Sequence, residues 1–409
     1  MSQAAQSAEA DNMPLLGIYL HWPFCSAICP YCDFNVYAAH KNTADPQDWL
    51  AAYRAELAYA HGLRPVGQVQ SVFFGGGTPS LMPAELVDDI LNHIDALWGL
   101  AVHAEISLEA NPVSAPAPHM QKLRQAGITR LSLGVQAFDD AALRFLGRTH
   151  SADEARRAFD AAQEIFDSTS FDLIYARPDQ SLDDWQRELS AALALAPQHM
   201  SLYQLTLEPD TPFHARALRG KLALPDEEAA ADLFELTQSL CTAAGLPPYE
   251  VSNHAAPTHI CRHNHAVWQG GDYAGIGPGA HGRLTLDGKK HASLALRQPQ
   301  EWLTACQKKG HGWDLNKLSD AEAAEEAVML GLRLTDGRPF EALAAQGVSF
   351  DKANLMGLQE DGLLMARDDC LQASDKGAAF IRLYYWTPAG VSVTALSPEI
   401  ALIVSRGAS

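Results

Sequence analysis

The chain has 409 residues, of which 47% are hydrophobic and 19% charged, and its formal net charge at pH 7 is −19. This length and composition predict a globular protein with a large core and room for two domains. The negative charge excludes sequence-independent binding to nucleic acid, because the phosphates would repel the chain and no basic stripe offsets it.

The N-terminus and the cysteine content indicate the cellular compartment of the protein. Residues 1–14 are polar and acidic and lack the apolar core of a secretory signal, so we expect a disordered lead-in. No apolar window is long enough for a transmembrane helix. Seven cysteines, an odd number, suit a reducing cytoplasm, in which clustered thiols bind metal instead of forming disulfides. The solitary Cys241, Cys306 and Cys370 are expected to be buried apolar groups.

Six short apolar runs alternate with amphipathic stretches over the first half of the chain. Because strands that are buried on both faces read as continuous apolar runs, the pattern predicts parallel strands joined by crossover helices. The stretch 151–166 is one such helix, which Thr149 or Ser151 could cap. Six units are too few for a closed eight-stranded barrel, so the sequence predicts an α/β fold with a partial (β/α)6 barrel over residues 15–250. The runs lie at 17–22, 71–76, 104–111, 129–136, 170–176 and 200–207.

The second half of the chain has a different rhythm. Residues 225–245 predict a helix that ends at Gly245. Residues 251–315 are rich in glycine and histidine, and we expect loops and short strands that connect to the barrel and pack on it. Residues 316–409 predict a small α-rich, winged-helix-like C-terminal domain. It lacks the basic face that DNA binding requires, so a structural or lid role is expected.

Three cysteines directly follow the first predicted strand, at Cys25, Cys29 and Cys32. Their spacing places three soft anionic ligands on one tight loop, as an iron–sulfur cluster with one open iron requires. Zinc is the alternative, but it usually takes four ligands in two separated pairs, and no second pair is present here. The position where a fourth nearby cysteine could fall is Phe34.

Polar signatures follow the other predicted strands. "GGGTPS" follows the second, "EANP" ends the third, "GVQ" ends the fourth and Asp172 lies in the fifth. In parallel α/β proteins the ligand site lies at the carboxyl ends of the strands, so these segments predict one shared site. The glycines would let the backbone approach a ligand closely, although "GGGTPS" is also compatible with an ordinary strand-to-helix turn.

The same motifs resemble the radical S-adenosylmethionine (SAM) superfamily, and within it the oxygen-independent coproporphyrinogen III oxidase-like group, over roughly residues 15 to 380. The resemblance implies a 4Fe–4S cluster whose open iron chelates SAM, and an electron from the cluster that cleaves SAM to a 5′-deoxyadenosyl radical. It implies that the three cysteines bind the cluster. The implied SAM-binding residues are Tyr19, Tyr31, Gly76, Gly77, Thr78, Glu109, Gln136, Arg148 and Asp172.

The chain departs from the group at two places. Where the superfamily usually reads glycine-leucine-proline-glycine, this chain has Ala176, Arg177, Pro178 and Asp179, which makes the loop stiffer and more charged. Phe34 stands where the coproporphyrinogen oxidases have a fourth cysteine. Those oxidases also carry a longer N-terminal region than the one that precedes the first strand here.

The stretches "SLYQLTLEPDTPF" and "HNHAVW" instead resemble the haem-chaperone branch, the HemW-type proteins. That branch carries His-Asn-x-x-Tyr-Trp, and here Val267 replaces the tyrosine. The resemblance implies that His263 is an axial ligand of haem iron, with His265 and Cys261 as alternatives and Trp268 as a flat face for the porphyrin. A loop that only closes the barrel is the other interpretation.

These observations predict a cytoplasmic haem chaperone that binds a 4Fe–4S cluster, SAM and haem. The expected partners are haem-acceptor proteins, for example of the respiratory chain, and an electron donor such as flavodoxin. A homodimer is left open, and no nucleic acid or membrane span is expected. The alternatives are an oxygen-independent coproporphyrinogen III oxidase and a structural protein with a vestigial zinc or cluster site. The sequence leaves open whether the chain is an enzyme.

Overall fold

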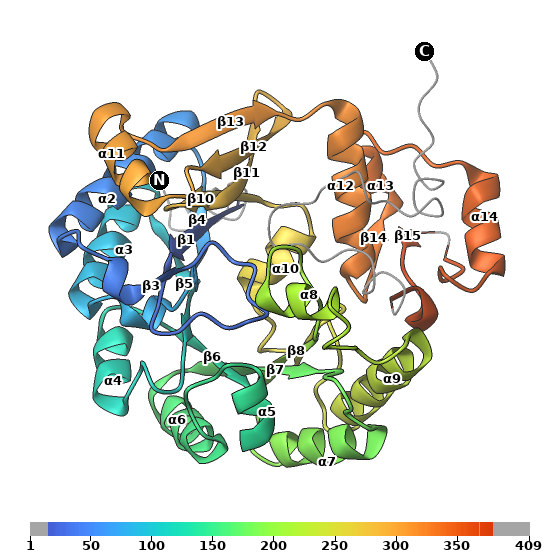
Figure 1. Ribbon diagram of the computed structural model, residues 1–409. Helices are drawn as coiled ribbons and strands as arrows, with labels where there is room; N and C mark the ends of the chain where they lie inside the picture. Colours follow the sequence, from blue (N-terminus) through green and yellow to red (C-terminus); the bar gives the residue numbers. More distant parts are fainter. Residues whose placement is uncertain (1–14, 368, 379–409) are drawn as a thin grey trace.

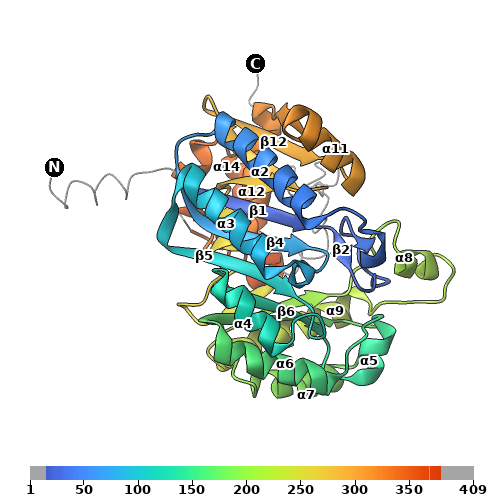
Figure 2. The ribbon, with the colours of Figure 1, turned by 90° about the vertical axis from the view of Figure 1, so that its left-hand side faces the viewer.

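The computed structural model describes residues 15–367 and 369–378. An open, curved sheet of eleven strands forms its centre, with helices on the outer face (Figures 1 and 2). Of its seven neighbouring parallel strands, six coincide with the six predicted runs, so the predicted α/β class with an open, partial barrel is confirmed. These six strands are β1 (Leu15–Trp22), β4 (Gln68–Gly76), β5 (Leu100–Ala110), β6 (Arg130–Gln136), β7 (Ser168–Tyr175) and β8 (His199–Gln204).

Amphipathic helices cover the outer face of these strands. Helix α6 begins at a capping box, in which the Ser151 and Glu154 side chains satisfy each other's backbone N–H groups. Trp185 of α7 and Phe159 of α6 are fully buried against the sheet. These helices are α2 (Pro46–Leu63), α3 (Ala84–Trp98), α4 (Ala117–Gln125), α5 (Asp140–Phe145), α6 (Ala152–Ile165), α7 (Leu182–Leu193) and α9 (Glu227–Ala243). The short helix α8 (Pro212–Ala217) instead packs against Pro30 and Tyr31.

The Gly- and His-rich stretch is more regular than the sequence suggests. Where loops are predicted, the structure has helix α10 (Arg262–Trp268). Strand β10 then pairs in parallel with the free edge of β1, and three antiparallel strands extend the sheet further. The elements of this extension are β10 (Asp272–Ile276), β11 (His281–Leu286), β12 (Lys289–Ala295), α11 (Pro299–Lys309) and β13 (Trp313–Lys317), whereas β9 (Asn253–Ala255) pairs with β8 at the opposite edge of the sheet.

One buried carboxyl joins this extension to the barrel helices. Glu56 of α2 accepts hydrogen bonds from the backbone N–H groups of Gly277 and Gly312, both at 2.8 Å, and from Nε1 of Trp302 at 3.0 Å. Burial raises the pKa of Glu56 to about 7, and the three hydrogen bonds oppose that shift. The extension is therefore an integral part of the sheet.

A small second core follows the sheet. It is formed by α12 (Asp320–Arg333), β14 (Arg338–Pro339), α13 (Phe340–Ala344), α14 (Lys352–Glu360) and β15 (Cys370–Leu371). Arg333 ties it to the barrel, because its Nη2 donates to the fully buried Glu250 carboxylate at 2.8 Å. The helix-rich C-terminal part agrees with the prediction, whereas the exact domain boundaries stay a prediction. Within the described ranges, no helix is long and apolar enough to cross a membrane. The predicted lead-in over residues 1–14 lies outside them.

Candidate functional site

The cysteine loop leaves β1 at the carboxyl end of the sheet, next to the end of β4. Backbone hydrogen bonds hold the two segments together, from Gly77 N to Trp22 O at 2.7 Å and from Thr78 N to Phe24 O at 2.9 Å. Two short strands, β2 (Phe24–Cys25) and β3 (Tyr37–Ala38), close the base of the loop. The loop is therefore fixed by the glycine-rich turn that follows β4.

The three thiols lie in a largely water-excluded setting. Cys25 and Cys29 are buried and Cys32 is partly buried. Burial raises the pKa of Cys32 to about 12, and it also raises the pKa of Cys25 against an opposing hydrogen bond with the Thr78 side chain. In the described part of the chain no three His, Cys, Asp or Glu side chains enclose a metal position. The structure thus gathers the three thiols on one loop, and burial opposes the deprotonation of Cys25 and Cys32 that ligation requires.

Arg148 is the cationic group beside this loop. Its Nη1 donates to the Cys29 sulfur at 3.4 Å, and its Nη2 donates to the Gly134 carbonyl at 2.6 Å. A guanidinium at this place offsets negative charge on sulfur. Three soft donors with a neighbouring cation fit an iron–sulfur cluster, whereas a structural zinc site takes a fourth protein ligand.

The glycines of "GGGTPS" are required by the close contact of this turn with β1 and the loop. Gly76 has a φ of +107°, and a Cβ on it would lie 2.5 Å from the His21 ring. A Cβ on Gly77 would lie 2.8 Å from the Phe24 carbonyl oxygen. The contacts of the strand-to-helix turn are therefore sufficient to explain why glycine is needed at these positions. Close approach of a ligand is not required to explain them.

Two carboxyl groups face the interior above this turn. Glu109 accepts from the backbone N–H of Gly76 at 3.1 Å, and Asp172 accepts from the Ser132 hydroxyl at 3.3 Å. Burial, and then the charge of Asp172, raises the pKa of Glu109 to about 8. Burial raises the pKa of Asp172 to about 6, although hydrogen bonds from Ser201 and Ser132 favour its charged form. Neither has an ion-pair partner among the described residues, so the pair would attract a cationic ligand.

The other predicted SAM residues lie around the same end. Gln136 ends β6 with a φ of +72°, an unusual conformation for a residue other than glycine. The Tyr19 hydroxyl is 2.9 Å from Nδ1 of His21. The Tyr31 ring lies 6.3 Å from the Phe213 ring. The structure therefore brings the three cysteines and nine predicted SAM residues to one end of the sheet.

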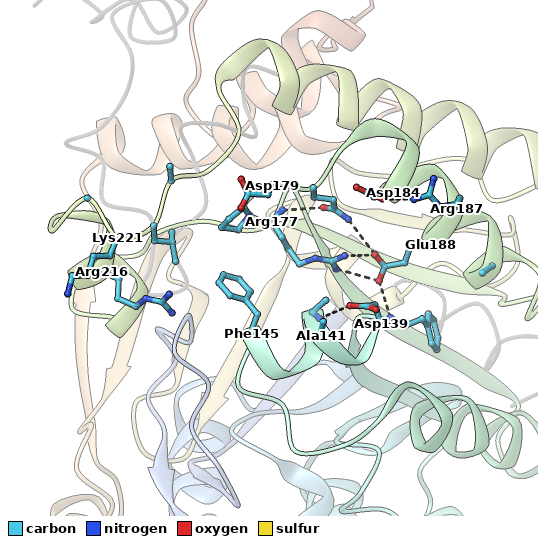
Figure 3. A pocket seen from close by; sticks show the side chains of 18 of the residues that line it. Asp139, Ala141, Phe145, Arg177, Asp179, Asp184, Arg187, Glu188, Arg216 and Lys221 are labelled. Atoms are coloured by element: carbon cyan, nitrogen blue, oxygen red, sulfur yellow. Dashed lines mark hydrogen bonds and ion pairs between the residues drawn. The ribbon is translucent and has the colours of Figure 1, made fainter.

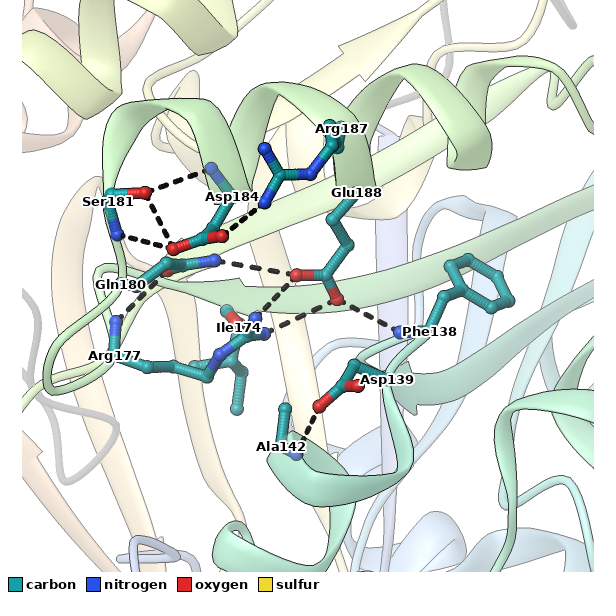
Figure 4. Close-up of polar contacts among 10 residues, drawn as sticks. All are labelled: Phe138, Asp139, Ala142, Ile174, Arg177, Gln180, Ser181, Asp184, Arg187 and Glu188. Carbon is teal, nitrogen blue, oxygen red and sulfur yellow. Dashed lines mark hydrogen bonds and ion pairs between the residues drawn. The ribbon is translucent and has the colours of Figure 1, made fainter.

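The loop after β7 differs from the superfamily in residue type but keeps a glycine-like backbone. Ala176 and Asp179 stand at the two glycine positions, with φ values of +54° and +59°. Arg177 forms a buried ion pair with Glu188 of α7, and Glu188 also accepts from the backbone N–H of Phe138 at 2.9 Å (Figure 4). The pair thus ties the loops after β6 and β7 to α7. Sequence analysis missed Glu188, although an arginine in a tight loop signals that an acid is near.

His263 lies at the opposite end of the strands. Its Nδ1 is 3.0 Å from the Ser71 hydroxyl, its ring stacks on Phe73 at 5.3 Å, and it is 5% exposed. Ser71 and Gly76 are five residues apart in β4, so about 16 Å separates them at the usual strand rise. Glu105 of β5 caps α10 by accepting from the backbone N–H groups of Arg262 and His263. The structure does not bring His263 near the cysteine loop.

The other proposed haem contacts in this segment are also occupied. The Arg333 guanidinium carbon lies 4.4 Å from the Trp268 ring centroid, so one face of that ring is covered. Cys261 is buried, and its thiol donates to Glu105 at 3.4 Å. Of the three candidate ligands only His265 is partly exposed, with the Tyr249 ring beside it at 6.3 Å.

Comparisons with known proteins define the class. The sequence profile described as the Radical SAM superfamily matches residues 19–191, and that of the HemN C-terminal domain matches residues 318–380. The solved structure of coproporphyrinogen III oxidase (HemN) from Escherichia coli, described in its title as a radical SAM enzyme, superposes with a TM-score of 0.74. It is 22% identical and covers 93% of this chain and 92% of its own, so it shows the fold alone. This is a radical SAM protein, a class that implies a 4Fe–4S cluster and SAM.

The curated relatives specify the branch. "Heme chaperone HemW" of Escherichia coli is 37% identical, over 90% of this chain and 97% of its own length. "Radical S-adenosyl methionine domain-containing protein 1, mitochondrial" of Bos taurus is 36% identical, over 91% of this chain and 87% of its own. The chain belongs to the HemW family.

Proposed function

We propose that this protein is a haem chaperone that binds a 4Fe–4S cluster, SAM and haem and passes haem to acceptor proteins such as respiratory enzymes. The observation that carries the proposal is the 37% identity to the Escherichia coli heme chaperone over 97% of that protein. Likeness to the coproporphyrinogen oxidase is limited to 22% identity and supports only a shared fold.

In this proposal Cys25, Cys29 and Cys32 hold the cluster. When bound, the cluster supplies the electron that cleaves the sulfonium of SAM to a 5′-deoxyadenosyl radical. Arg148 donates a hydrogen bond to the Cys29 sulfur and offsets the negative charge of the thiolates. Since burial raises the pKa of Cys25 and Cys32, reconstitution should release protons and should improve as the pH rises.

SAM would lie above the glycine-rich turn, next to the cysteine loop. Glu109 and Asp172 are the only acids of the predicted set, so they are the acceptors for its ammonium and ribose groups. Gln136, with its strained backbone, is a second ribose contact. The remaining predicted contacts line the same end of the sheet: Tyr19, Tyr31, Gly76, Gly77 and Thr78.

For haem, the burial pattern changes the order of the three candidate ligands. His263 and Cys261 are 5% and 2% exposed, and each already has a hydrogen-bond partner. A porphyrin could reach His263 only after α10 moved away from β4. His265 is partly exposed, and burial lowers its pKa, which favours the neutral imidazole that binds iron. We therefore put His265 first and keep His263 as the alternative.

The cellular setting is also part of the proposal. All seven cysteines are free, which is consistent with a reducing cytoplasm. An electron donor such as flavodoxin would reduce the cluster. Haem-acceptor proteins and a homodimer are further expected partners.

One experiment separates the chaperone from the alternative, an oxygen-independent coproporphyrinogen III oxidase. Anaerobically reconstituted protein is mixed in one arm with haem and in the other with coproporphyrinogen III, SAM and a reductant. We expect about one haem per chain in the first arm and no protoporphyrinogen in the second. The Escherichia coli oxidase is the positive control. Several turnovers to protoporphyrinogen, without haem binding, would replace the proposal by the alternative.

A further inference from the structure

A basic segment stands out on this acidic protein. Residues 211–225 contain no Asp or Glu, in a chain with a net charge of −19, and they carry Arg216, Arg219 and Lys221. All three side chains are exposed, and none has a carboxylate partner among the residues that the structure describes. Asp210 and Asp226 lie directly outside the segment. Unpaired positive charge is thus concentrated on α8 and the turn after it.

This segment rests on the cysteine loop. The backbone N–H of Phe213 donates to the Pro30 carbonyl at 3.0 Å, and the Phe213 ring lies 6.3 Å from that of Tyr31, the neighbour of Cys32. Arg216 lies over the Phe213 ring at 5.4 Å. A short series of contacts therefore connects the exposed cations with the residues that would hold the cluster.

Beside the segment the surface is hollowed. A pocket of about 980 Å³ opens between α5, α7 and α8 (Figure 3). Arg216 and Lys221 line one side of it, and the Arg177–Glu188 ion pair lies on the other. Arg187 in the wall is already paired with Asp184. The free positive charge therefore lies at the side of the pocket that is formed by α8.

We propose that Arg216, Arg219 and Lys221, together with this pocket, form the docking surface for an acidic electron-donor protein that reduces the cluster. The proposal rests on the cluster part of the proposed function and not on haem. One electron leaves the reduced flavin of the donor and enters the cluster, and no bond is made or broken. An acidic donor is repelled by the net charge of the chain and attracted by this segment, so its electrostatics select one orientation. In that orientation the donor lies against the cysteine loop.

The test compares two charge reversals of equal size. Arg216→Glu with Lys221→Glu changes two cations that line the pocket, and Lys308→Glu with Lys309→Glu changes two exposed lysines on α11, which have no ion pair among the described residues. Titration calorimetry measures the affinity of oxidised flavodoxin, an acidic probe. Wild-type affinity should fall about tenfold from roughly 20 to 200 mM salt. At low salt the α8 variant should bind at least tenfold more weakly, and the α11 variant should stay within about threefold.

A kinetic arm checks that the surface serves electron transfer. Cluster reduction by reduced flavodoxin should slow in the α8 variant by a similar factor, while reduction by dithionite and iron content stay as in wild type. Arg216→Gln with Lys221→Gln, which removes the two charges without reversing them, should give an intermediate loss even if the reversal impairs folding.

The proposal would be overturned if the two reversal variants bound flavodoxin with equal affinity, or if the affinity of the wild type did not depend on salt concentration. So would loss of haem binding in the α8 variant with donor affinity unchanged, because the pocket would then be a small-molecule site. If the protein binds the donor as predicted but takes up no haem, the proposed chaperone function would be wrong and the proposed docking surface would still be supported.

Discussion

Two glutamates on the same face of β5 show how differently the two ends of the barrel are built. Glu105, toward the amino end, accepts from the Cys261 thiol and from the backbone N–H groups of Arg262 and His263. Glu109, toward the carboxyl end, accepts from the backbone N–H of Gly76 and lies near the charge of Asp172, and its pKa is raised to about 8. Residues 261–263 supply three hydrogen-bond donors to Glu105, whereas the described residues supply one to Glu109, so we expect the other partners of Glu109 to come from a ligand.

The backbone and the packing show the same contrast. Residues with a left-handed backbone end the strands on the carboxyl side, at Gly76, Gln136 and Ala176. Strain of this kind persists where the surrounding structure imposes it, often at ligand sites. At the amino end, His263 is packed between Ser71 and Phe73 and closes the barrel. A histidine-rich motif is therefore weak evidence for a ligand site until the surroundings of each imidazole are known.

The largest expected effect is at the cysteine loop. Replacing any one of Cys25, Cys29 or Cys32 with alanine removes one of only three protein ligands, so the cluster should be lost. Anaerobic reconstitution followed by iron analysis and absorption spectroscopy should give about four irons per chain for wild type and none for the variants.

Cys241 provides the matched control for that experiment. It is fully buried in the barrel core, away from the loop. Cys241→Ala should keep full iron content at some cost in stability. Full cluster content in the Cys25, Cys29, Cys32 triple variant would end the assignment of the carboxyl end as the cofactor site.

The second prediction compares two histidines on α10, the partly exposed His265 and the buried His263, as haem ligands. His265→Ala should weaken haem binding at least tenfold, about 1.4 kcal/mol, because it removes the axial bond. His263→Ala should leave haem affinity nearly unchanged but lower the stability, because it empties a packed position between Ser71 and Phe73. Haem titration and chemical denaturation of both variants provide the measurements. The opposite pattern would restore His263 as the ligand and require that α10 opens.

The sequence predicts the carboxyl end well because each strand there is a continuous apolar run with a polar signature directly after it. It predicts the strand extension poorly, because β10 is short and contains Gly275, and its pairing with the free edge of β1 is a long-range contact. The resemblance supplied the residues around SAM but not Glu188, whose partner Arg177 lies where this chain departs from the usual superfamily pattern.

The amino end was the least predictable part of the site. The sequence indicates that Trp268 is aromatic, but not that Arg333 from the C-terminal part covers its ring. It also cannot show that Glu105, far away in the chain, caps α10. Such contacts depend on tertiary packing, which a local sequence motif does not predict.

A pH effect follows from the raised pKa of Glu109. Its folded-state pKa of about 8 lies above the ordinary value of 4.5, so the protonated form favours folding. Its contribution to stability is present at low pH and is lost as the pH rises through about 8. Between pH 7 and pH 9 this amounts to about 1.4 kcal/mol for the apoprotein. Because the pKa of Glu56 is also raised, to about 7, the measured quantity is the difference between wild type and Glu109→Gln.

Denaturant unfolding at the two pH values checks this prediction. The free energy of unfolding of wild type should fall more steeply than that of Glu109→Gln over this interval. Parallel pH dependences for the two proteins would show that the Glu109 carboxyl is not held protonated.

The smallest expected effect concerns the loop after β7. Ala176 has a φ of +54°, which costs alanine more than glycine, whereas glycine loses more backbone entropy on folding. Ala176→Gly should therefore change the unfolding free energy by less than about 1 kcal/mol. Ala191→Gly, at an exposed position of helix α7, is the control and should destabilise by about 1 kcal/mol. A larger change at Ala176 would show that its methyl group has a packing role.

The most direct test of the contrast between the two ends uses Glu105→Gln and Glu109→Gln, the same conservative change at two places on one strand. Each variant is measured for SAM affinity after anaerobic reconstitution and for its free energy of unfolding as apoprotein. We expect Glu109→Gln to lose at least tenfold in SAM affinity without loss of stability, and Glu105→Gln to lose about 1–2 kcal/mol of stability with SAM affinity unchanged. If Glu105→Gln weakens SAM binding while Glu109→Gln only destabilises the fold, the assignment of the two ends is wrong.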